Sequence, residues 1–193
     1  AIWDERRKEL FLARDRMGVK PLYYVITGAG LTFGSEMKVV LANSTVERRL
    51  DVAALNEYLS YEYVPTPRTI FQDIRRLPPG HYLTWNRLDT KLVEYWRPSL
   101  ARSESHSPVQ WRDFAGGLRD VLRASVKQEL VSDVPVGVLL SGGIASSVVA
   151  AFMAEAYEGD VDSFSVAFDE PSFDESGFAR LVASHLGTRH HEL

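Results

Sequence analysis

A pair of adjacent glycines flanked by serines is the part of this sequence best suited to chemistry. The run reads Ser141-Gly142-Gly143-Ile144-Ala145-Ser146-Ser147, and the residues just before it, 136–140, are apolar or glycine. This pattern predicts a buried strand that ends in a turn of small residues and opens a helix. Glycines let the backbone approach an anion closely, and the first N–H groups of a helix have no internal partner. We therefore expect a phosphate-binding loop, with ATP or its pyrophosphate as the ligand.

Two better-known phosphate loops are excluded by the residues themselves. The G-x-x-x-x-G-K-[ST] loop needs spaced glycines and a lysine, whereas Gly142 and Gly143 are adjacent and no lysine follows them. No G-x-G-x-x-G follows this strand, and the pair Gly28 and Gly30 lies between two short strands, which indicates a hairpin turn. One structural alternative stays open for the serine-glycine loop, namely a turn that merely joins a strand to a helix.

The loop resembles the S-G-G-x-D-S signature of the PP-loop ATP pyrophosphatases, which split ATP between its α and β phosphates to adenylate a substrate. Ala145 stands where that family carries aspartate. The carboxylate expected there would lie near the phosphates and help to organise Mg²⁺ or the loop, which a methyl group does not do. Three explanations stay open: an inactive member, an altered branch of the family, or a substitution in this particular sequence.

The resemblance extends over essentially the whole chain. The first half looks like the later half of a glutaminase domain of the N-terminal-nucleophile type, on segments 12–24, 33–36 and 77–83. The second half is similar to the start of the synthetase domain of glutamine-hydrolysing asparagine synthetase, on segments 132–143, 164–166 and 185–192. Several motifs in the family's order are more specific than any one of them, so the chain is identified as a member of this family.

Chemistry and resemblance together assign a set of ATP-binding residues. The loop offers serine hydroxyls and glycine N–H groups to the pyrophosphate, and the helix from Ile144 adds its positive end. In similar enzymes the residue before the first serine and a valine on the next strand line the adenine pocket, although both are also ordinary sheet-core residues. The expected residues are Leu140, Ser141, Gly142, Gly143, Ser146, Ser147 and Val166. Mg²⁺ is the implied cofactor, and no metal ligand is assigned because Ala145 replaces the expected aspartate.

The resemblance implies a reaction as well as a site. Magnesium-ATP and aspartate would form β-aspartyl-AMP and pyrophosphate, and ammonia released from glutamine would displace AMP to give asparagine. The implied partners are these small molecules, with a homodimer as the assembly to consider. Two alternatives stay open: a related synthetase that amidates another carboxylate or closes a lactam, and an inactive binding or regulatory remnant.

The absence of cysteine bears on the glutaminase half. The chain contains no cysteine, which removes disulfides and thiolate metal sites. Glutamine hydrolysis in the resembled family uses an amino-terminal cysteine, whereas this chain opens with Ala1-Ile2-Trp3, which looks like the middle of that domain. We expect an internal fragment that carries no catalytic residue and does not hydrolyse glutamine by itself.

Two styles of secondary structure divide the chain. Alternating, aromatic-rich runs in the first half predict an α+β antiparallel portion, and strand-helix alternation in the second half predicts an α/β portion with a parallel, Rossmann-like sheet. Residues 99–108 have the composition of a linker and include an exposed-looking His106. We therefore predict the C-terminal half of a glutaminase domain at 1–98 and the first part of an ATP-binding domain at 109–193.

Individual elements follow from local signals. Strands are expected at 10–14, 22–27, 69–71 and 81–85, and Ser35 and Asp51 are expected to cap two helices. In the second half the expected order is helix 109–131, strand 136–140, a helix after the loop, strand 161–168, helix 174–185 and a further strand. The helix at 174–185 is expected to turn Phe178, Leu181, Val182 and Leu186 inward.

The remaining signals mostly argue against other functions. The net charge of −4 comes from 22 basic and 26 acidic residues without a long basic run, so nothing favours nucleic acid or an anionic membrane. No apolar stretch reaches the length that crosses a bilayer, and the cytoplasm is the expected location. His190 and His191 are not expected to hold a metal, because adjacent strand residues point to opposite faces. Asp174 and Glu175 are interpreted as capping acids, with a role in binding the substrate or Mg²⁺ as the alternative.

Overall fold

The computed structural model of this chain describes residues 1–99 and 111–193. The chain forms two compact units, Ala1–Arg102 and Ser103–Leu193, which we call the first and second units and describe separately. The predicted linker at 99–108 lies outside the described residues except for Ser99, and His106 also lies outside them. Within the described residues, no helix is both long enough and apolar enough to span a membrane.

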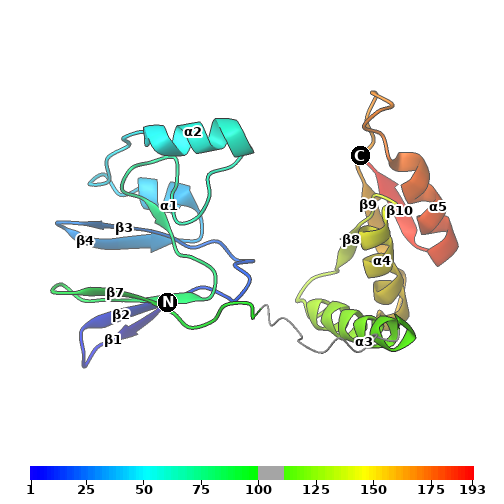
Figure 1. The fold of residues 1–193 in the computed structure, drawn as a ribbon, viewed down its shortest axis with the longest axis horizontal. Helices are drawn as coiled ribbons and strands as arrows, with labels where there is room; N and C mark the ends of the chain where they lie inside the picture. Colours follow the sequence, from blue (N-terminus) through cyan, green and yellow to red (C-terminus); the bar gives the residue numbers. More distant parts are fainter. Residues whose placement is uncertain (100–110) are drawn as a thin grey trace. The chain divides into compact units, whose positions relative to one another are not determined.

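The first unit consists of two antiparallel sheets and two helices. A four-stranded sheet has the order β1-β2-β6-β7, and a three-stranded sheet has the order β4-β3-β5. Figure 1 shows three layers, with the three-stranded sheet between the four-stranded sheet and the helices. The strands are β1 Ile2–Asp4, β2 Glu9–Ala13, β3 Tyr23–Thr27, β4 Gly30–Gly34, β5 Arg75–Arg76, β6 His81–Trp85 and β7 Thr90–Glu94. The helices are α1 Met37–Leu41 and α2 Val52–Tyr61.

Two apolar clusters hold these layers together. Leu12, Leu77 and Leu83 are buried in the cluster to which the facing strands of both sheets contribute. Val25 and Val40 are buried in the second cluster, where α1 packs on the three-stranded sheet. The alternation along β2 and β6 therefore turns one side chain in two into the core, as period-two patterning requires.

Arg14 holds together the loops that follow β2. Its guanidinium is almost buried and donates three hydrogen bonds to backbone carbonyls, of Lys20 at 2.9 Å, Leu77 at 2.7 Å and Gly18 at 2.6 Å. Burial, followed by the nearby Arg76, lowers the pKa of Arg14 from its usual value. Arg14 thus serves the fold of this unit, because every one of these hydrogen bonds ties together its own loops.

Most of the local predictions for the first unit are confirmed, and two are wrong. The Gly28–Gly30 turn joins β3 to β4, so it is a hairpin and not a dinucleotide loop. Residues 69–71 are not a strand: the Thr69 hydroxyl bonds to the carbonyls of Phe71 and Ile74, which bends the backbone back on itself. Asp51 caps α2 as expected, but Glu36, not Ser35, occupies the N-cap position of α1.

The second unit is a three-stranded parallel sheet with helices, and it contains the predicted loop. The sheet order is β10-β9-β8, which places the first strand at one edge and the second in the middle. The elements are α3 Trp111–Glu129, β8 Gly137–Leu139, α4 Ile144–Ala156, β9 Asp162–Ser165, α5 Ser176–Leu186 and β10 Arg189–Glu192. Figure 1 shows β8, β9 and β10 side by side, with α4 and α5 beside them. The antiparallel first part and the parallel second part confirm the predicted fold class at this level.

The packing of α5 corrects one prediction and confirms another. Phe178 and Leu181 were expected to face inward but are 68% and 71% exposed, whereas Ala179 and Ala183 are buried. Val182 and Leu186 do pack against the core. The serine-glycine loop approaches the backbone of α5 closely at Phe178 and Ala179. β8 is also less covered than its apolar sequence predicts, since Val138 is buried but Leu139 is 78% exposed.

Candidate functional site

The serine-glycine loop connects the end of β8 to the start of α4, as the sequence predicts. β8 ends at Leu139, Gly143 is the N-cap residue, and α4 begins at Ile144. Gly142 has a φ of +80°, and a Cβ built on it would lie 2.5 Å from the backbone carbon of Phe178. Glycine is required here for both reasons, because the left-handed conformation and the contact with α5 each exclude a side chain.

The loop is shaped by hydrogen bonds among its own serines. The hydroxyls of Ser141 and Ser146 lie 3.0 Å apart, and the Ser146 hydroxyl also donates to the Gly143 carbonyl at 3.1 Å. The N–H groups of Ser141 and Gly143 donate to the Ser146 and Ser141 hydroxyls, each at 3.3 Å. These contacts hold the turn in one conformation. Helix geometry leaves the first N–H groups of α4 without intrahelical acceptors, so an anion can bind them.

A pocket of about 440 Å³ opens where β8 and β9 end. Four of the residues predicted to bind ATP line it, namely Leu140, Ser141, Ser146 and Val166. The pocket therefore joins the loop to the end of the neighbouring strand, which is the arrangement expected of ligand sites in parallel sheets. The remaining lining residues are Leu139, Phe164, Ser165, Phe168, Phe173 and Glu175.

The other three predicted residues do not line this pocket. Gly142 and Gly143 form the turn of the loop and would contact a ligand only through their backbone. Ser147 lines a different cavity, of about 560 Å³, together with Val182 and Leu186 of α5. The Ser147 hydroxyl oxygen is buried there without a hydrogen-bond partner. Ala145, where the aspartate was expected, is exposed in the first turn of α4.

Sequence reasoning missed the aromatic part of the pocket. Phe164 comes from β9, and Phe168 and Phe173 come from the connection between β9 and α5. Phe168 and Phe173 are 53% and 70% exposed, so their rings offer apolar surface to a ligand. A planar, partly apolar ring such as adenine suits such walls. The available signal was an aromatic residue every few positions after a strand end, which is too common to be diagnostic by itself.

A polar network, also missed, lies beside the pocket. Ser165, the last residue of β9, lines the pocket and has its hydroxyl 3.1 Å from Nε2 of His190. The other ring nitrogen of His190, Nδ1, lies 2.9 Å from the hydroxyl of Ser163. No local sequence pattern predicts these contacts, because the partners are 25 and 27 residues apart in the sequence.

The acids near α5 have different roles. Asp174 accepts hydrogen bonds from the Ser176 N–H at 3.1 Å and the Ser176 hydroxyl at 2.9 Å. These two bonds lower the pKa of Asp174, which keeps it ionised at the start of α5. Glu175 instead is the only carboxylate among the residues that line the pocket. Asp174 thus acts as a capping acid, while Glu175 is available to a ligand.

The histidines of β10 are engaged in the sheet. His191 lies 2.7 Å from Asp162, and Arg189 forms a two-pronged ion pair with the same carboxylate at 2.5 Å. The hydrogen bonds from Arg189, and then from His191, lower the pKa of Asp162 far below its usual range. His190 turns to the opposite face, toward the serines of β9. Among the described residues, no group of three histidine or acidic side chains is placed to hold a metal ion.

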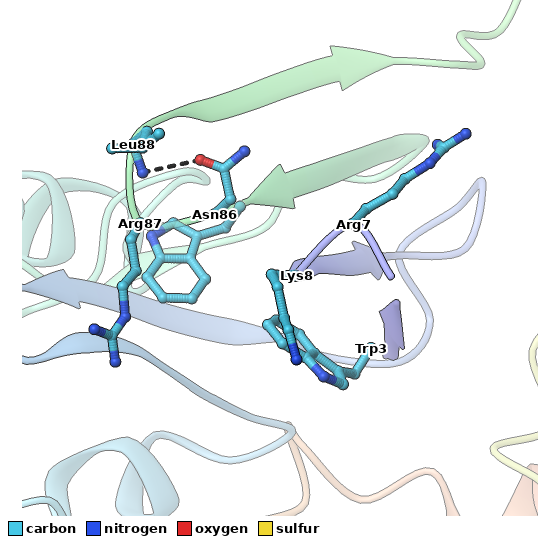
Figure 2. Close-up of a pocket in the computed structure, with 7 residues that line it drawn as sticks. Trp3, Arg7, Lys8, Asn86, Arg87 and Leu88 are labelled. Carbon is cyan, nitrogen blue, oxygen red and sulfur yellow. Dashed lines mark hydrogen bonds between the residues drawn. The ribbon is translucent and has the colours of Figure 1, made fainter. Parts of the chain in front are cut away.

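A second pocket lies on the first unit and is lined by aromatic, basic and amide side chains. It has a volume of about 540 Å³ and lies between the tips of two hairpins (Figure 2). Figure 2 shows that Trp3, Arg7 and Lys8 come from one hairpin and Asn86, Arg87 and Leu88 from the other. No carboxylate, hydroxyl or imidazole is among the residues that line it. The described residues therefore favour the pocket at the strand ends as the functional site.

Comparison with known families divides the chain in the same way as its fold. Residues 1–96 match the family model of the glutamine amidotransferase domain. Residues 117–193 match the family model of asparagine synthase. The serine-glycine loop, both strand ends and the pocket they form all lie within the second match.

Curated relatives cover both parts of the chain at once. Asparagine synthetase [glutamine-hydrolyzing] 3 of Bacillus subtilis is 34% identical over 207 residues, covering 100% of this chain and 33% of the relative. Asparagine synthetase [glutamine-hydrolyzing] 1 of the same organism is 33% identical, covering 96% of this chain and 29% of the relative. Amidase chyE of Penicillium rubens is 33% identical, covering 98% of this chain and 30% of the relative. The chain spans about a third of the length of these relatives.

Proposed function

Because this chain belongs to the glutamine-hydrolysing asparagine synthetase family, we propose that it provides part of the glutaminase domain and the ATP-binding loop of an enzyme that makes asparagine. The enzyme would be a carbon-nitrogen ligase that uses glutamine as the amide donor. The first unit would be part of a glutaminase domain of the N-terminal-nucleophile type, at 1–98. The second would be the start of a PP-loop domain, at 109–193, with residues 99–108 as the linker.

The observation that carries this proposal is a serine-glycine loop at a helix N-terminus that borders a pocket with aromatic walls. Leu140, Val166 and the phenylalanines would bind adenine, and the loop would bind the phosphates through its N–H groups and serine hydroxyls. Ser141, Gly142, Gly143 and Ser146 surround the N-terminus of α4. Ser147 is the predicted residue with the weakest support, since its hydroxyl lines the cavity beside α5.

The proposed reaction has two steps. A carboxylate oxygen of the aspartate side chain attacks the α-phosphorus of ATP, and the bond to the β-phosphate oxygen breaks to release pyrophosphate. Ammonia then attacks the acyl carbon, AMP leaves, and a proton passes to solvent. The N-terminus of α4 would stabilise the negative charge that develops on the departing pyrophosphate. No residue of this chain is assigned the role of nucleophile, for either aspartate activation or glutamine hydrolysis.

Magnesium enters this proposal only with the nucleotide. Mg²⁺ prefers carboxylate and phosphate oxygens in octahedral geometry. Ala145 offers no ligand, and Glu175 is the only carboxylate that lines the pocket, so the described residues do not by themselves form a magnesium site. A carboxylate at position 145 would supply such a ligand.

The proposal predicts ATP binding and an aspartate-dependent exchange reaction. Isothermal titration of the protein with ATP should give a single site, and Val166→Lys, which places a cation in the exposed part of the adenine wall, should weaken ATP binding at least tenfold. Radioactive pyrophosphate should exchange into ATP only when aspartate is present, because exchange requires the adenylate. A matched titration with GTP controls for the base.

Three outcomes decide the matter. Exchange supported by aspartate and not by glutamate, followed by asparagine formation on addition of ammonium, supports the proposal. Exchange supported only by a different acid contradicts asparagine synthesis but keeps the ATP site. No binding of ATP contradicts the site itself and would leave the loop as a structural turn.

A further inference from the structure

A chain of hydrogen bonds runs from β10 into the wall of the candidate ATP pocket. The Thr188 and Ser163 hydroxyls lie 2.7 Å apart, Ser163 is 2.9 Å from Nδ1 of His190, and Nε2 of His190 is 3.1 Å from the Ser165 hydroxyl. Ser163 is 0% exposed and Ser165 is 7% exposed. The imidazole therefore bridges two serines on the same face of β9, one of which lines the pocket.

A carboxylate lies beside one nitrogen of this imidazole. Oε1 of Glu192 lies 3.7 Å from Nε2 of His190, and Glu192 is held by two hydrogen bonds from Arg180 of α5, at 3.0 and 2.9 Å. A carboxylate beside Nε2 favours the tautomer in which Nε2 carries the proton. Nδ1 is then an acceptor, which matches a chain in which Thr188 donates to Ser163 and Ser163 donates to Nδ1.

This tautomer decides what Ser165 can offer to a ligand. When Nε2–H donates, the Ser165 oxygen accepts, and the hydrogen of the Ser165 hydroxyl is left for another acceptor. In the opposite tautomer, the Ser165 hydroxyl would donate to Nε2 and have no hydrogen to give. Ser165 is almost buried, so water competes poorly for that hydrogen, and the pocket is the adjoining space.

We propose that Ser165 is a hydrogen-bond donor to the nucleotide and that His190, oriented by Glu192, is the residue that positions it. The inference rests on the proposed ATP site and adds two residues to it. The acceptor on the ligand is an oxygen or ring nitrogen of the nucleotide that lies at the end of β9. The β9–β10 register sets this arrangement, since it pairs Glu192 with Ser165 and His190 with Ser163.

The two serines provide a matched pair of variants for the test. Ser165→Ala and Ser163→Ala each remove one hydroxyl from the same imidazole, on the same strand and face. In titrations with ATP, Ser165→Ala should raise the dissociation constant about fivefold, the usual effect of one lost hydrogen bond. Ser163→Ala should leave the dissociation constant within about twofold and lower the melting temperature instead, because it affects only the buried end of the network.

Variants of His190 separate the two ring nitrogens. His190→Gln keeps a polar group near the Nε2 position and should retain most of the ATP affinity, whereas His190→Asn keeps one near Nδ1 and should behave like Ser165→Ala. Long-range ¹H–¹⁵N correlation spectra of the unliganded wild-type protein should show Nε2–H for His190. Glu192→Gln should shift that spectrum toward the mixed or Nδ1–H form.

The outcomes separate this inference from the proposed function. If the wild-type protein binds no ATP, the proposed function fails, and the tautomer spectrum is then the remaining test of the network. If the wild type binds ATP and Ser165→Ala binds it equally well, the inference is wrong and the ATP site stands. Equal losses of affinity in both serine variants, or an Nδ1–H spectrum in the wild type, would also overturn it.

Discussion

Ala145 is the residue at which the loop departs from the S-G-G-x-D-S pattern that it resembles. It is the second residue of α4 and is exposed, so a longer side chain has room there. The position lies at the positive end of the helix, next to where the phosphates are proposed to bind. Residues 141–147 contain no carboxylate. The effect of introducing one on ATP affinity depends on whether a cation accompanies the nucleotide.

Ala145→Asp should therefore change ATP affinity in opposite directions with and without magnesium. With Mg²⁺, the new carboxylate supplies an oxygen ligand and should tighten ATP binding by roughly fivefold, or ~1 kcal/mol. Without Mg²⁺, the same carboxylate repels the phosphates and should weaken binding. Calorimetric titration in both conditions measures the two effects.

The neutral control for that experiment is Ala145→Asn, which has nearly the same shape as aspartate and no charge. It should show neither the gain nor the loss. Equal affinities of the Asp and Asn variants for magnesium-ATP would mean that position 145 has no contact with the cation, and the role assigned to the missing carboxylate would be withdrawn.

At the scale of elements, the serine-glycine loop packs directly against α5. Gly142 touches the backbone of Phe178 and Ala179, so the conformation of the loop depends on how close α5 lies. This contact places the backbone at the start of α5 directly against the loop. It also means that the loop is preorganised by tertiary packing as well as by its own serine hydrogen bonds.

Gly142→Ala should consequently destabilise the second unit. The left-handed backbone costs a residue with a Cβ about 1 kcal/mol or more, and the contact with α5 adds a steric clash. We expect a loss of at least ~2 kcal/mol in the free energy of unfolding, together with a loss of ATP binding. Urea unfolding followed by circular dichroism measures the first effect, and calorimetry the second.

Gly177 provides the matched control, because it lies on α5 itself and a Cβ there would meet nothing within 4 Å. Gly177→Ala should be neutral or stabilise the protein by up to about 1 kcal/mol, since alanine favours helix. A similar loss of stability in both variants would show that the effect comes from α5 and not from the loop.

At the scale of the whole molecule, each unit has hydrophobic clusters of its own among the described residues. Two clusters of buried residues belong to the first unit, around Val25 and Leu83, and one belongs to the second, around Ala150 and Met153. Each described cluster draws its residues from one unit only. Unfolding is cooperative within a packed core, so each unit is expected to unfold as its own cooperative transition.

Differential scanning calorimetry should therefore resolve two transitions that respond to different changes. Leu83→Ala truncates a side chain that is 1% exposed in the first unit. It should lower the melting temperature of one transition by the equivalent of about 2–5 kcal/mol, the range typical of buried leucines. Saturating ATP should raise only the other transition. A single transition that both changes shift would contradict independent cores.

The sequence by itself determined those features that depend on neighbours along the chain. The β3–β4 hairpin, strand His81–Trp85, the Asp51 cap and the strand-loop-helix around Gly142 all follow from glycine placement, capping residues and apolar periodicity over a few positions. The family was also evident from sequence, because several motifs occur in a fixed order. Local signals failed at residues 69–71, where the Thr69 side chain bonds to the backbone and bends a run that reads as a strand.

Only the tertiary structure decided which side chains meet. Parallel pairing of β9 with β10 brings His190 to Ser165, α5 packs closely against Gly142, and Ser147 lies in a separate cavity. Such contacts depend on the register and spacing of elements that are tens of residues apart. Periodicity within one element shows which residues form its apolar face, but not which neighbouring element covers that face. The wall of the pocket depends on such contacts between elements, so the sequence alone did not predict it.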